Sequence, residues 1–355
     1  MLFEHPIERP VLSVAETNAV MQSTHHRHAA VTFRFRTAAV LSTAMLAAAC
    51  FPVAAQPDYP KRPIRIVVPY SVGGGTDINA RSVAPKLAER WGQQIVVDNR
   101  PGGNAIIGTD IVAKAVPDGH TILFSASSEI ATNISLFKSV PYDPRTDLQP
   151  VTLASTTPLI IVAHPSIQVK SVKELIVVAK QRNLSYASVG TGSPQHLAAE
   201  WLKSIAKFDM THIPFKGAGP ALIDNVAGHV PVGFQALLPA VPHVKSGRLN
   251  ALAVTSAERS HALSEVPTLK EAGYPDIELV QWYGVFVPAK TPRAIVKKIN
   301  IEINAILNLP YVKERLAAGG ADVRANVSPV QFERFVRAEI DKNRHVVRIA
   351  GVKGE

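Results

Sequence analysis

The stretch PYSVGGGTD, residues 69–77, decides the fold class because it joins an apolar run to a helical pattern through three glycines. The run before it, Ile64–Val68, predicts a buried strand, and Ile78–Trp91 after it carries apolar residues at helical spacing. Glycines let a ligand approach the backbone closely. A helix N-terminus adds unpaired amides and partial positive charge, so the stretch is a candidate anion site.

Strands and helices alternate along the rest of the chain. Further strands are predicted at residues 94–97, 121–125, 158–163, 184–189, 211–215, 230–235, 249–255 and 282–288. This alternation predicts an α/β fold in which mainly parallel sheets are flanked by helices. The theme of strand, glycine-rich turn and helix recurs at Gly190–Pro194, so we predict two lobes. Residues 56–157 with 281–355 would form the first lobe and 158–280 the second, with a ligand in the cleft between them.

Several helix starts are predicted from capping residues. Ser171 is followed three residues later by Glu174, which is the pattern of a capping box. Ser193-Pro194 has an N-cap residue followed by proline at the first helical position. Thr291-Pro292 and Ser328-Pro329 predict two further helices with the same chemistry.

The N-terminal region has the composition of an export signal. Basic side chains precede the apolar segment Thr37–Ala49, which is too short to span a bilayer. Val53-Ala54-Ala55 places small residues where a signal peptidase cleaves. We therefore predict that residues 1–55 are an upstream leader and signal peptide, that Met1 or Met21 is the start, and that the protein is periplasmic.

Cys50 is the only cysteine of the chain. Lipidation at Cys50 is the less favoured alternative, because Ala47 stands where a larger apolar residue is preferred. Cleavage before Gln56 would leave a chain without cysteine, which excludes disulfides and thiol catalysis.

The charge distribution favours small anions as ligands. The full chain carries +10, and the leader's four arginines and three glutamates leave +9 for the remainder. The basic residues are scattered, without runs or aromatic interleaving, so we predict no nucleic-acid partner. The histidines show no metal-ligand spacing, and we predict neither a metal nor a cofactor.

The first glycine loop does not match the nucleotide motifs. A P-loop requires a lysine directly after its last glycine, and the next lysine here is Lys86. A dinucleotide fingerprint requires glycine at position 78, which is Ile78; Asp98 lies at a suitable distance for the acidic residue and keeps this disfavoured alternative open. A carboxylate suits the same amides as a phosphate. A tight turn without any ligand is an equal alternative.

Four side chains near the loops have both a structural and a ligand-binding interpretation. Asp77 would complement the helix dipole or accept from a ligand, and Tyr70 would be a core aromatic or donate to an anion. Ser193 is not in a G-x-S-x-G elbow, since Gln195 stands where the closing glycine is required, so a hydrolase is not indicated. His196 is expected to pack or cap, with ligand contact as the minor alternative.

Eight segments then occur in a characteristic order: PYSVGGGTD, VVDNRPGGNAIIG, PDGHTILF, PYDPRTDLQPVTL, GTGSPQHLAAE, HIPFKGAGPALIDNVAG, SGRLNALAVTSAERSHALSEVPTLKEAGYP and VPAKTP. Together they resemble the periplasmic substrate-binding receptors of tripartite tricarboxylate transporters, the Bug-type receptors. The resemblance runs from about Asp58 to the C-terminus. It implies a two-lobed type II periplasmic-binding (Venus-flytrap) fold that closes on its ligand and performs no catalysis.

The resemblance also implies the site. In the family a ligand carboxylate lies between the first glycine loop and the GTGS loop, held by backbone amides and ordered waters. The ligand-binding residues carried over are Tyr70, Ser71, Val72, Gly73, Gly74, Gly75, Asp77, Ser125, Ser127, Gly190, Thr191, Gly192, Ser193, His196, Phe215, Lys216 and Gly217. The chain departs from the family pattern at Gly228-His229-Val230-Pro231-Val232, where the family often has an acidic residue, and at Gln235-Ala236, where it often has asparagine. Both departures lie toward the far end of the pocket and bear on which ligand fits, and Gln235 is added to the predicted site.

The resemblance therefore predicts an extracytoplasmic receptor that delivers a small organic carboxylate to transporter membrane subunits, acting as a monomer. A solute sensor that feeds a membrane kinase is an alternative on the same fold. A secreted enzyme is disfavoured, since no spacing of nucleophile and base or of metal ligands is recognisable. Dicarboxylates, tricarboxylates, aromatic acids and amino acids all stay open as ligands.

Overall fold

The computed structural model describes residues 59–354, which form an α/β body of mixed sheets and surrounding helices. The predicted signal peptide, its cleavage site and Cys50 lie outside the described residues. None of the helices within residues 59–354 combines the length and apolar composition that a bilayer crossing requires.

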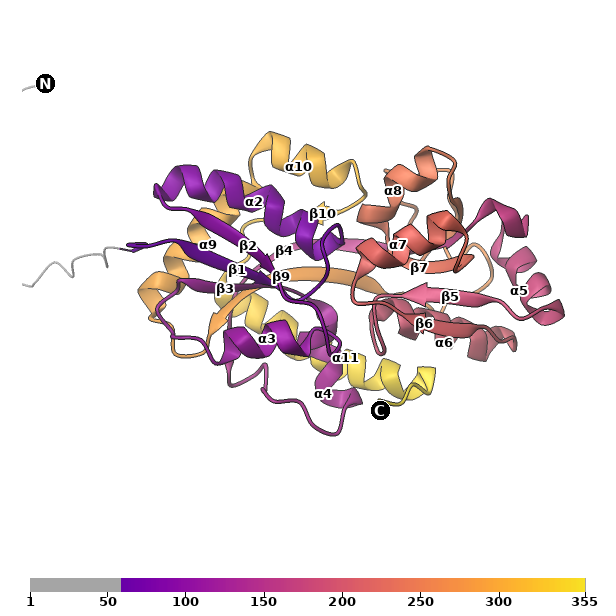
Figure 1. Cartoon of the computed structure of the whole chain (residues 1–355), viewed down its shortest axis with the longest axis horizontal. Helices are drawn as coiled ribbons and strands as arrows, with labels where there is room; N and C mark the ends of the chain where they lie inside the picture. Colours follow the sequence, from indigo (N-terminus) through magenta and orange to yellow (C-terminus); the bar gives the residue numbers. More distant parts are fainter. Residues whose placement is uncertain (1–58, 355) are drawn as a thin grey trace, which may run out of the picture. The chain divides into compact units, whose positions relative to one another are not determined.

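The first lobe is built on three parallel strands. They are β1 (Ile64–Val68), β2 (Ile95–Asn99) and β3 (Thr121–Ala126), with β1 in the middle. The helices α2 (Gly75–Trp91) and α3 (Ile106–Ala113) follow β1 and β2 and pack against these strands (Figure 1). The strand and the helix predicted on either side of PYSVGGGTD are therefore confirmed, and α2 begins at the third glycine.

Two long antiparallel strands connect the lobes. β4 (Leu148–Ala163) pairs with β9 (Val280–Pro288) along its first part and with strands of the second lobe along its last part. β9 in turn pairs with β3, which gives the strand order β2-β1-β3-β9-β4-β7-β5-β6. Figure 1 shows β4 and β9 running between the lobes. The predicted lobe boundary after residue 157 thus falls inside β4, and the one after residue 280 falls at the start of β9; both stay predictions.

The second lobe repeats the parallel arrangement. Its strands are β5 (Ser185–Ser188), β6 (Thr211–Pro214), β7 (Val232–Ala236) and β8 (Asn250–Val254). β5 pairs in parallel with β6 and β7, whereas β7 and β8 run antiparallel to β4. The helices are α5 (Val172–Gln181), α6 (Pro194–Ala206), α7 (Ala218–Ala227) and α8 (Leu237–Lys245). The strands β1, β2 and β3, like β5, β6 and β7, therefore pair in parallel, whereas β4 and β9 pair antiparallel with their neighbours.

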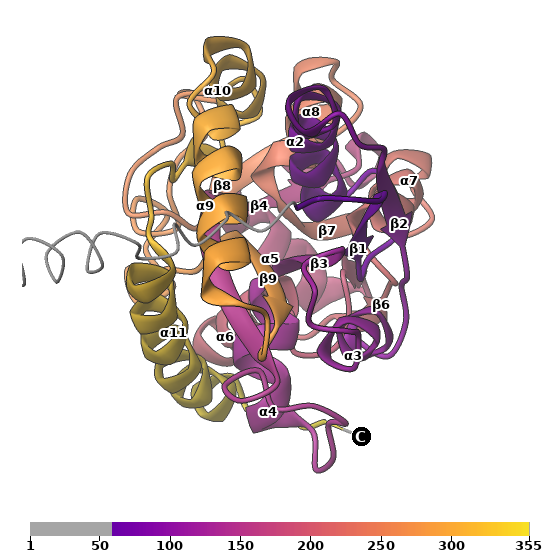
Figure 2. The ribbon, with the colours of Figure 1, turned by 90° about the vertical axis from the view of Figure 1, so that its left-hand side faces the viewer.

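The C-terminal helices pack against both lobes. They are α9 (Arg293–Leu307), α10 (Pro310–Ala317) and α11 (Pro329–Ala350), and a short strand β10 (Asp322–Val323) pairs with β4. The first part of α11 buries Phe332 against Trp282 and Phe286 of β9. Its last part buries Val347 and Ala350 in the core of the second lobe. Figure 2 shows α11 along one side of the body, next to α9.

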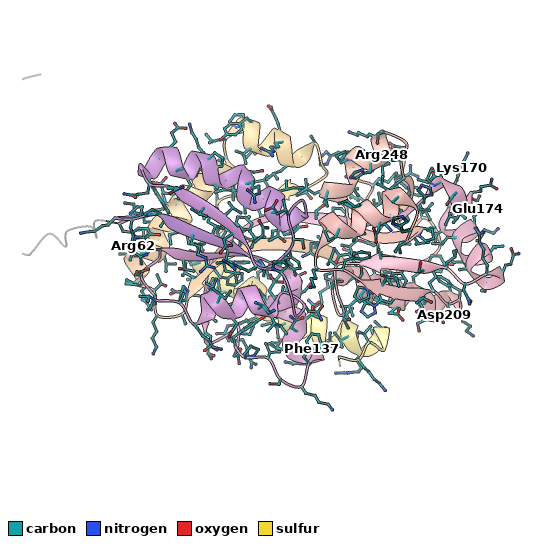
Figure 3. All side chains as sticks on the ribbon, in the orientation of Figure 1. Arg62, Phe137, Lys170, Glu174, Asp209 and Arg248 are labelled. Atoms are coloured by element: carbon teal, nitrogen blue, oxygen red, sulfur yellow. The ribbon has the colours of Figure 1, made fainter. Side chains whose placement is uncertain are left out.

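The predicted helix starts are partly confirmed. Ser193 and Ser328 are N-caps whose hydroxyl oxygens accept from the backbone three residues on. Ser171 is also an N-cap, but the carboxylate of Glu174 accepts from the backbone N–H of Lys170 instead of closing a capping box. Figure 3 shows Lys170 and Glu174 at the far end of the second lobe.

The predicted cap at Thr291 is wrong. The hydroxyl of Thr291 donates backwards to the carbonyl of Pro288 at 2.8 Å. The N-cap of α9 is Pro292, one residue later than predicted, and it makes no side-chain hydrogen bond to the first turn.

Candidate ligand-binding site

The first glycine loop lies against the start of α7, on the other lobe. The backbone N–H and the hydroxyl of Ser71 both donate to the carbonyl of Lys216, each at 3.1 Å. A Cβ built on Gly219 would lie 2.1 Å from the carbonyl oxygen of Val72. The loop after β1 and the loop after β6 are therefore in direct backbone contact across the cleft.

Asp77 fixes the backbone conformation of the first glycine loop. Its Oδ2 accepts from the backbone N–H of Gly73 at 3.1 Å, and Gly73 adopts a φ of +86° that favours glycine. Its Oδ1 accepts from Arg81 Nε at 2.9 Å and from Asn99 Nδ2 at 3.0 Å, and the side chain is 3% exposed. These partners support the structural interpretation of Asp77, and its ligand-binding role stays a prediction.

A small cavity lies where α2, α6 and α7 begin. It encloses about 20 Å³ of water-accessible space, which holds about one ordered water. Three predicted site residues line it, namely Tyr70, Gly74 and Gly75. The others that line it were not predicted: Thr76, Ala126, Val189, Gln195, Ala218, Ala236, Gln281 and Tyr283.

Free helix amides surround this cavity. Within residues 59–354 no hydrogen-bond partner exists for the first-turn amides Gly75, Thr76 and Asp77 of α2, Gln195 of α6, and Ala218 and Gly219 of α7. The N-cap residues of α2 and α7 are glycines without a capping side chain. Unpaired amides together with the helix dipoles favour an anion at this point. The sequence predicted the starts of α2 and α6 here. It also predicted a helix near residues 221–227, which is α7, but it did not predict that this helix begins at Ala218, beside the cavity.

A larger cavity adjoins the small one. It has about 250 Å³ of water-accessible space, just below the range of about 300–1,000 Å³ that small-molecule sites occupy. Tyr70 and Val189 line both cavities. The larger one is also lined by four predicted site residues: Gly190, Thr191, Phe215 and Lys216. Its remaining residues are Gly102, Gly103, Asn104, Ala105 and Pro214.

The second glycine loop packs against the first lobe. Gly190 and Gly192 have φ values of +133° and +74°. A Cβ on Gly190 would lie 2.4 Å from Asn104 Oδ1, and one on Gly192 would lie 2.1 Å from Leu136 Cδ2. Both positions therefore require glycine, for backbone conformation and for space.

The turn around Asn104 is left-handed. Gly102, Gly103, Asn104 and Ala105 have φ values of +129°, +54°, +52° and +69° in succession. Non-glycine residues in this region are uncommon and cluster at ligand sites. The carbonyl of Asn104 accepts from Asn133 Nδ2 at 2.9 Å, which anchors the turn. The glycine pair in VVDNRPGGNAIIG was the available signal for this part of the cavity wall.

His196 stabilises the second glycine loop through a hydrogen bond. Its Nδ1 accepts from the backbone N–H of Gly192 at 2.9 Å, and its ring stacks on His212 with 3.8 Å between centroids. Burial lowers the pKa of His196 to about 4, so the ring is neutral. Ser193 Oγ accepts from the His196 backbone at 3.2 Å, so these two side chains are not arranged as a nucleophile and its base. This geometry favours the packing interpretation of His196.

Three predicted site residues lie behind the cavities. Ser125 Oγ donates to the Gly284 carbonyl at 3.4 Å, and Ser127 Oγ accepts from Gln281 Nε2 at 3.0 Å. Gln235 Nε2 donates to Asn225 Oδ1 at 2.9 Å. None of the three lines either cavity, so their contact with a ligand stays a prediction.

A buried carboxyl group stands beside Tyr70. Glu129 belongs to a π-helical turn, η2 (Ser128–Thr132), that directly follows β3, and it is 0% exposed. Its Oε2 accepts from the Tyr70 hydroxyl at 2.6 Å and its Oε1 accepts from the Ala126 N–H at 2.7 Å. Burial raises the pKa of Glu129 to about 7, and burial next to Glu129 raises the pKa of the Tyr70 hydroxyl. Sequence reasoning missed this group, because a lone glutamate after a strand carries no signal.

Metal binding has no support in the described part of the chain. Between residues 59 and 354, no cluster of three or more His, Cys, Asp or Glu side chains is placed to hold an ion. The cavities instead border unpaired helix amides and the side chain of Tyr70, which suit reversible binding of an anion.

Comparisons with known proteins agree with this geometry. Residues 79–352 match the family model described as tripartite tricarboxylate transporter family receptor. Protein BugT of Bordetella pertussis (strain Tohama I) is 38% identical over 316 residues, which cover 88% of this chain and 95% of that protein.

Three solved structures are also similar. A protein of R. palustris with adipate is 36% identical at a TM-score of 0.80, covering 83% of this chain and 99% of that one. The periplasmic binding protein BugD is 33% identical at a TM-score of 0.80, covering 84% and 100%. MatC from Rhodopseudomonas palustris with bound malate is 32% identical at a TM-score of 0.77, covering 81% and 100%. The predicted periplasmic-binding-protein fold is thereby confirmed.

Proposed function

Because the chain belongs to the tripartite tricarboxylate transporter receptor family, we propose that it binds a small organic carboxylate between its lobes and delivers it to the membrane subunits of such a transporter. The family is one of solute receptors, so the chain is a binding protein and not an enzyme. Two similar structures hold adipate and malate, and both ligands are dicarboxylates.

The convergence of free amides at three helix starts is the observation that carries this proposal. Gly75 and Ala218 belong to different lobes, yet both line the same small cavity. A charge at one helix N-terminus gains up to about 2 kcal/mol in a partly buried setting, and the low polarity of a closed cleft strengthens the attraction. One carboxylate group at this point would therefore hold both lobes together.

The two cavities suggest how a dicarboxylate would lie. One carboxylate would point toward the amides beside Gly75 and Ala218, and the single ordered water that the small cavity can hold would bridge the carboxylate to them. The remainder of the ligand would extend past Tyr70 and Val189, which line both cavities, toward the left-handed turn at Asn104. The predicted contacts at Gly190, Thr191 and Lys216 belong to this second part.

The place and partners of the protein are part of the same proposal. Similar structures are described as periplasmic, which supports a periplasmic location for this chain. Delivery to membrane subunits follows from the family. The monomeric state and the lack of a nucleic-acid partner stay predictions.

A ligand screen tests the proposal. Protein stripped of bound solutes by denaturation and refolding is tested against adipate, malate, citrate, benzoate and glutamate by thermal shift, and hits are measured by calorimetry. At least one acid should raise the melting temperature and bind with 1:1 stoichiometry. The fully esterified methyl ester of that acid, which has no carboxylate left, is the matched control and should not bind. If no acid binds, or if the ester binds equally well, the proposed carboxylate site is wrong.

A further inference from the structure

We propose that Glu129 takes up one proton when a carboxylate ligand binds, and that this proton turns Tyr70 into a hydrogen-bond donor for the ligand. The inference rests on the proposed carboxylate site. It adds a group that the cavity does not expose, and it makes ligand affinity depend on pH.

The geometry places the proton acceptor directly behind the cavity wall. Tyr70 lines both cavities, and its hydroxyl lies 2.6 Å from Glu129 Oε2. The other oxygen of Glu129 is fixed by the Ala126 amide, and Ala126 also lines the small cavity. Glu129 is thus hydrogen-bonded to two residues that line the ligand space.

No cation compensates the charge of Glu129. Within residues 59–354 no lysine, arginine or histidine forms an ion pair with it. A buried carboxylate without a cation is costly, and the group becomes neutral more easily than in water. The π-helical turn that carries Glu129 is a feature that proteins retain mostly at functional sites.

The titratable groups that face Glu129 from the surrounding elements are tyrosines and carboxyl groups, which do not compensate its negative charge. Tyr70 approaches from the loop after β1 and Tyr283 from β9, and the hydroxyl of Tyr142 donates to the Glu129 carbonyl at 2.8 Å. α11 also packs against η2, but its nearby carboxylate, Glu339, accepts from the Trp282 indole at 3.0 Å. Burial first, and then the charges of Glu129 and of Asp110 in α3, raise the pKa of the Tyr142 hydroxyl.

The hydroxyl of Tyr70 has a single hydrogen. While Glu129 is ionised, that hydrogen is donated to the carboxylate, and the Tyr70 oxygen offers only lone pairs to its other neighbours. A ligand carboxylate would be repelled by these lone pairs and by the buried negative charge of Glu129. When Glu129 takes a proton from solvent, its own O–H donates to the Tyr70 oxygen. The Tyr70 hydrogen is then free to donate to the ligand, so one proton enters with each ligand.

The test measures proton uptake by calorimetry. Adipate is titrated into the wild-type protein and E129Q at pH 6, 7, 8 and 9, each in two buffers of different ionisation enthalpy. For the wild type we expect uptake that approaches one proton per ligand above pH 8, and a dissociation constant that weakens up to about tenfold per pH unit there. The glutamine of E129Q can accept from Ala126 and donate to Tyr70, so it mimics the protonated group. E129Q should bind without proton uptake and with a nearly constant affinity.

Two further variants test a neighbouring carboxylate as a control and the Tyr70 hydroxyl as the proposed donor. E339Q removes a carboxylate that is hydrogen-bonded to the neighbouring Trp282 but lines neither cavity, and it should keep the proton uptake of the wild type. Y70F should weaken binding at pH 6 more than at pH 9, because it removes the hydroxyl that donates only when Glu129 is protonated. Equal proton uptake in the wild type and E129Q would overturn the inference.

A ligand-free measurement separates this inference from the proposed function. The infrared band of a protonated carboxylic acid should titrate near pH 7 in the wild type and be absent from E129Q. If adipate and malate do not bind but this band titrates, the choice of ligand fails and the buried proton acceptor stands. If an acid binds and no such band exists at pH 6, the inference fails and the receptor function stands.

Discussion

Gly75 lies directly against Tyr283: a Cβ on Gly75 would be 2.0 Å from the tyrosine hydroxyl oxygen and 2.6 Å from the ring carbon that bears it. Tyr283 belongs to β9, more than 200 residues further along the chain, and it is 2% exposed. The residue that opens α2 is therefore fixed by a strand that connects the lobes. Glycine is the only residue that fits without moving a buried ring, and both residues line the small cavity.

We expect Gly75→Ala to destabilise the protein and weaken ligand binding. The added methyl group would have to displace Tyr283 or the first turn of α2, and overpacking of this kind costs about 1–3 kcal/mol. Urea denaturation measures the loss of stability, and calorimetry measures the loss of affinity. The double variant G75A/Y283F should recover part of both, since it removes the nearest atom. Wild-type values for Gly75→Ala would show that the contact is not as tight as the structure has it.

Gly219→Ala should impair closure of the lobes with little effect on their folding. Its Cβ would lie 2.1 Å from the Val72 carbonyl, which belongs to the opposite lobe and is part of the backbone. The two loops must then separate, so we expect ligand affinity to fall at least about tenfold while the ligand-free melting temperature changes little. Small-angle X-ray scattering with ligand should show a more open particle than the wild type.

Ile223→Ala provides the control for that experiment. It lies one turn further along α7, its side chain is 69% exposed, and it should bind as the wild type does. An unchanged affinity for Gly219→Ala would mean that the close approach of Val72 and Gly219 has no part in ligand binding.

Ser193→Val should lower both stability and ligand affinity. The Ser193 hydroxyl caps α6 by accepting from the His196 amide, and loss of such a cap costs about 1 kcal/mol. The freed turn also carries Gln195, whose amide is one of the unpaired donors. Ser193→Thr keeps the hydroxyl and should restore most of the cap. If Ser193→Val loses stability but binds normally, the second loop supports the fold alone.

The buried proton acceptor predicts a definite pH dependence of stability. The folded pKa of Glu129, about 7, exceeds its ordinary value of 4.5, so the folded state holds this proton more strongly than the unfolded chain does. The stabilisation is therefore complete below pH 4.5 and is lost as the pH rises through 7, by an amount of the order of 3 kcal/mol.

Urea denaturation of the wild type and E129Q between pH 5 and 8.5 checks this sign. The difference between the two proteins should grow in favour of E129Q as the pH rises. Taking the difference removes the contribution of His196, whose lowered pKa makes the protein less stable as the pH falls below 6.5. A difference that does not vary with pH would contradict the prediction.

The sequence predicts well what local chemistry determines. The strand Ile64–Val68, the helix after PYSVGGGTD and the N-cap at Ser193 follow from side-chain periodicity and capping, which act within a few residues. The contact partners of these elements do not follow from local chemistry. The start of α7 meets the first glycine loop only after β6 is placed next to β5, and Tyr283 meets Gly75 only after β9 has crossed between the lobes.

The residues at the end of β3 are a second case in which local sequence does not determine which side chains line the cavity. The family resemblance implied that Ser125 and Ser127, at the end of β3, would contact the ligand. The structure uses their hydroxyls for hydrogen bonds to β9, and the nearby groups that line or support the cavity are Ala126 and Glu129. Successive residues at the end of a strand point in different directions, and only the tertiary contacts decide which one faces the ligand.

Because β4 runs through both lobes, the chain cannot be divided into its two lobes without cutting this strand. A fragment that begins at residue 158 would start in the middle of a 16-residue strand, and residues 148–157, left in the other piece, would be separated from β9, their pairing partner. Neither piece would keep an intact sheet edge, so the lobes are not interchangeable modules. New ligand preferences are then more accessible through changes in the loops that border the cleft than through recombination of whole lobes.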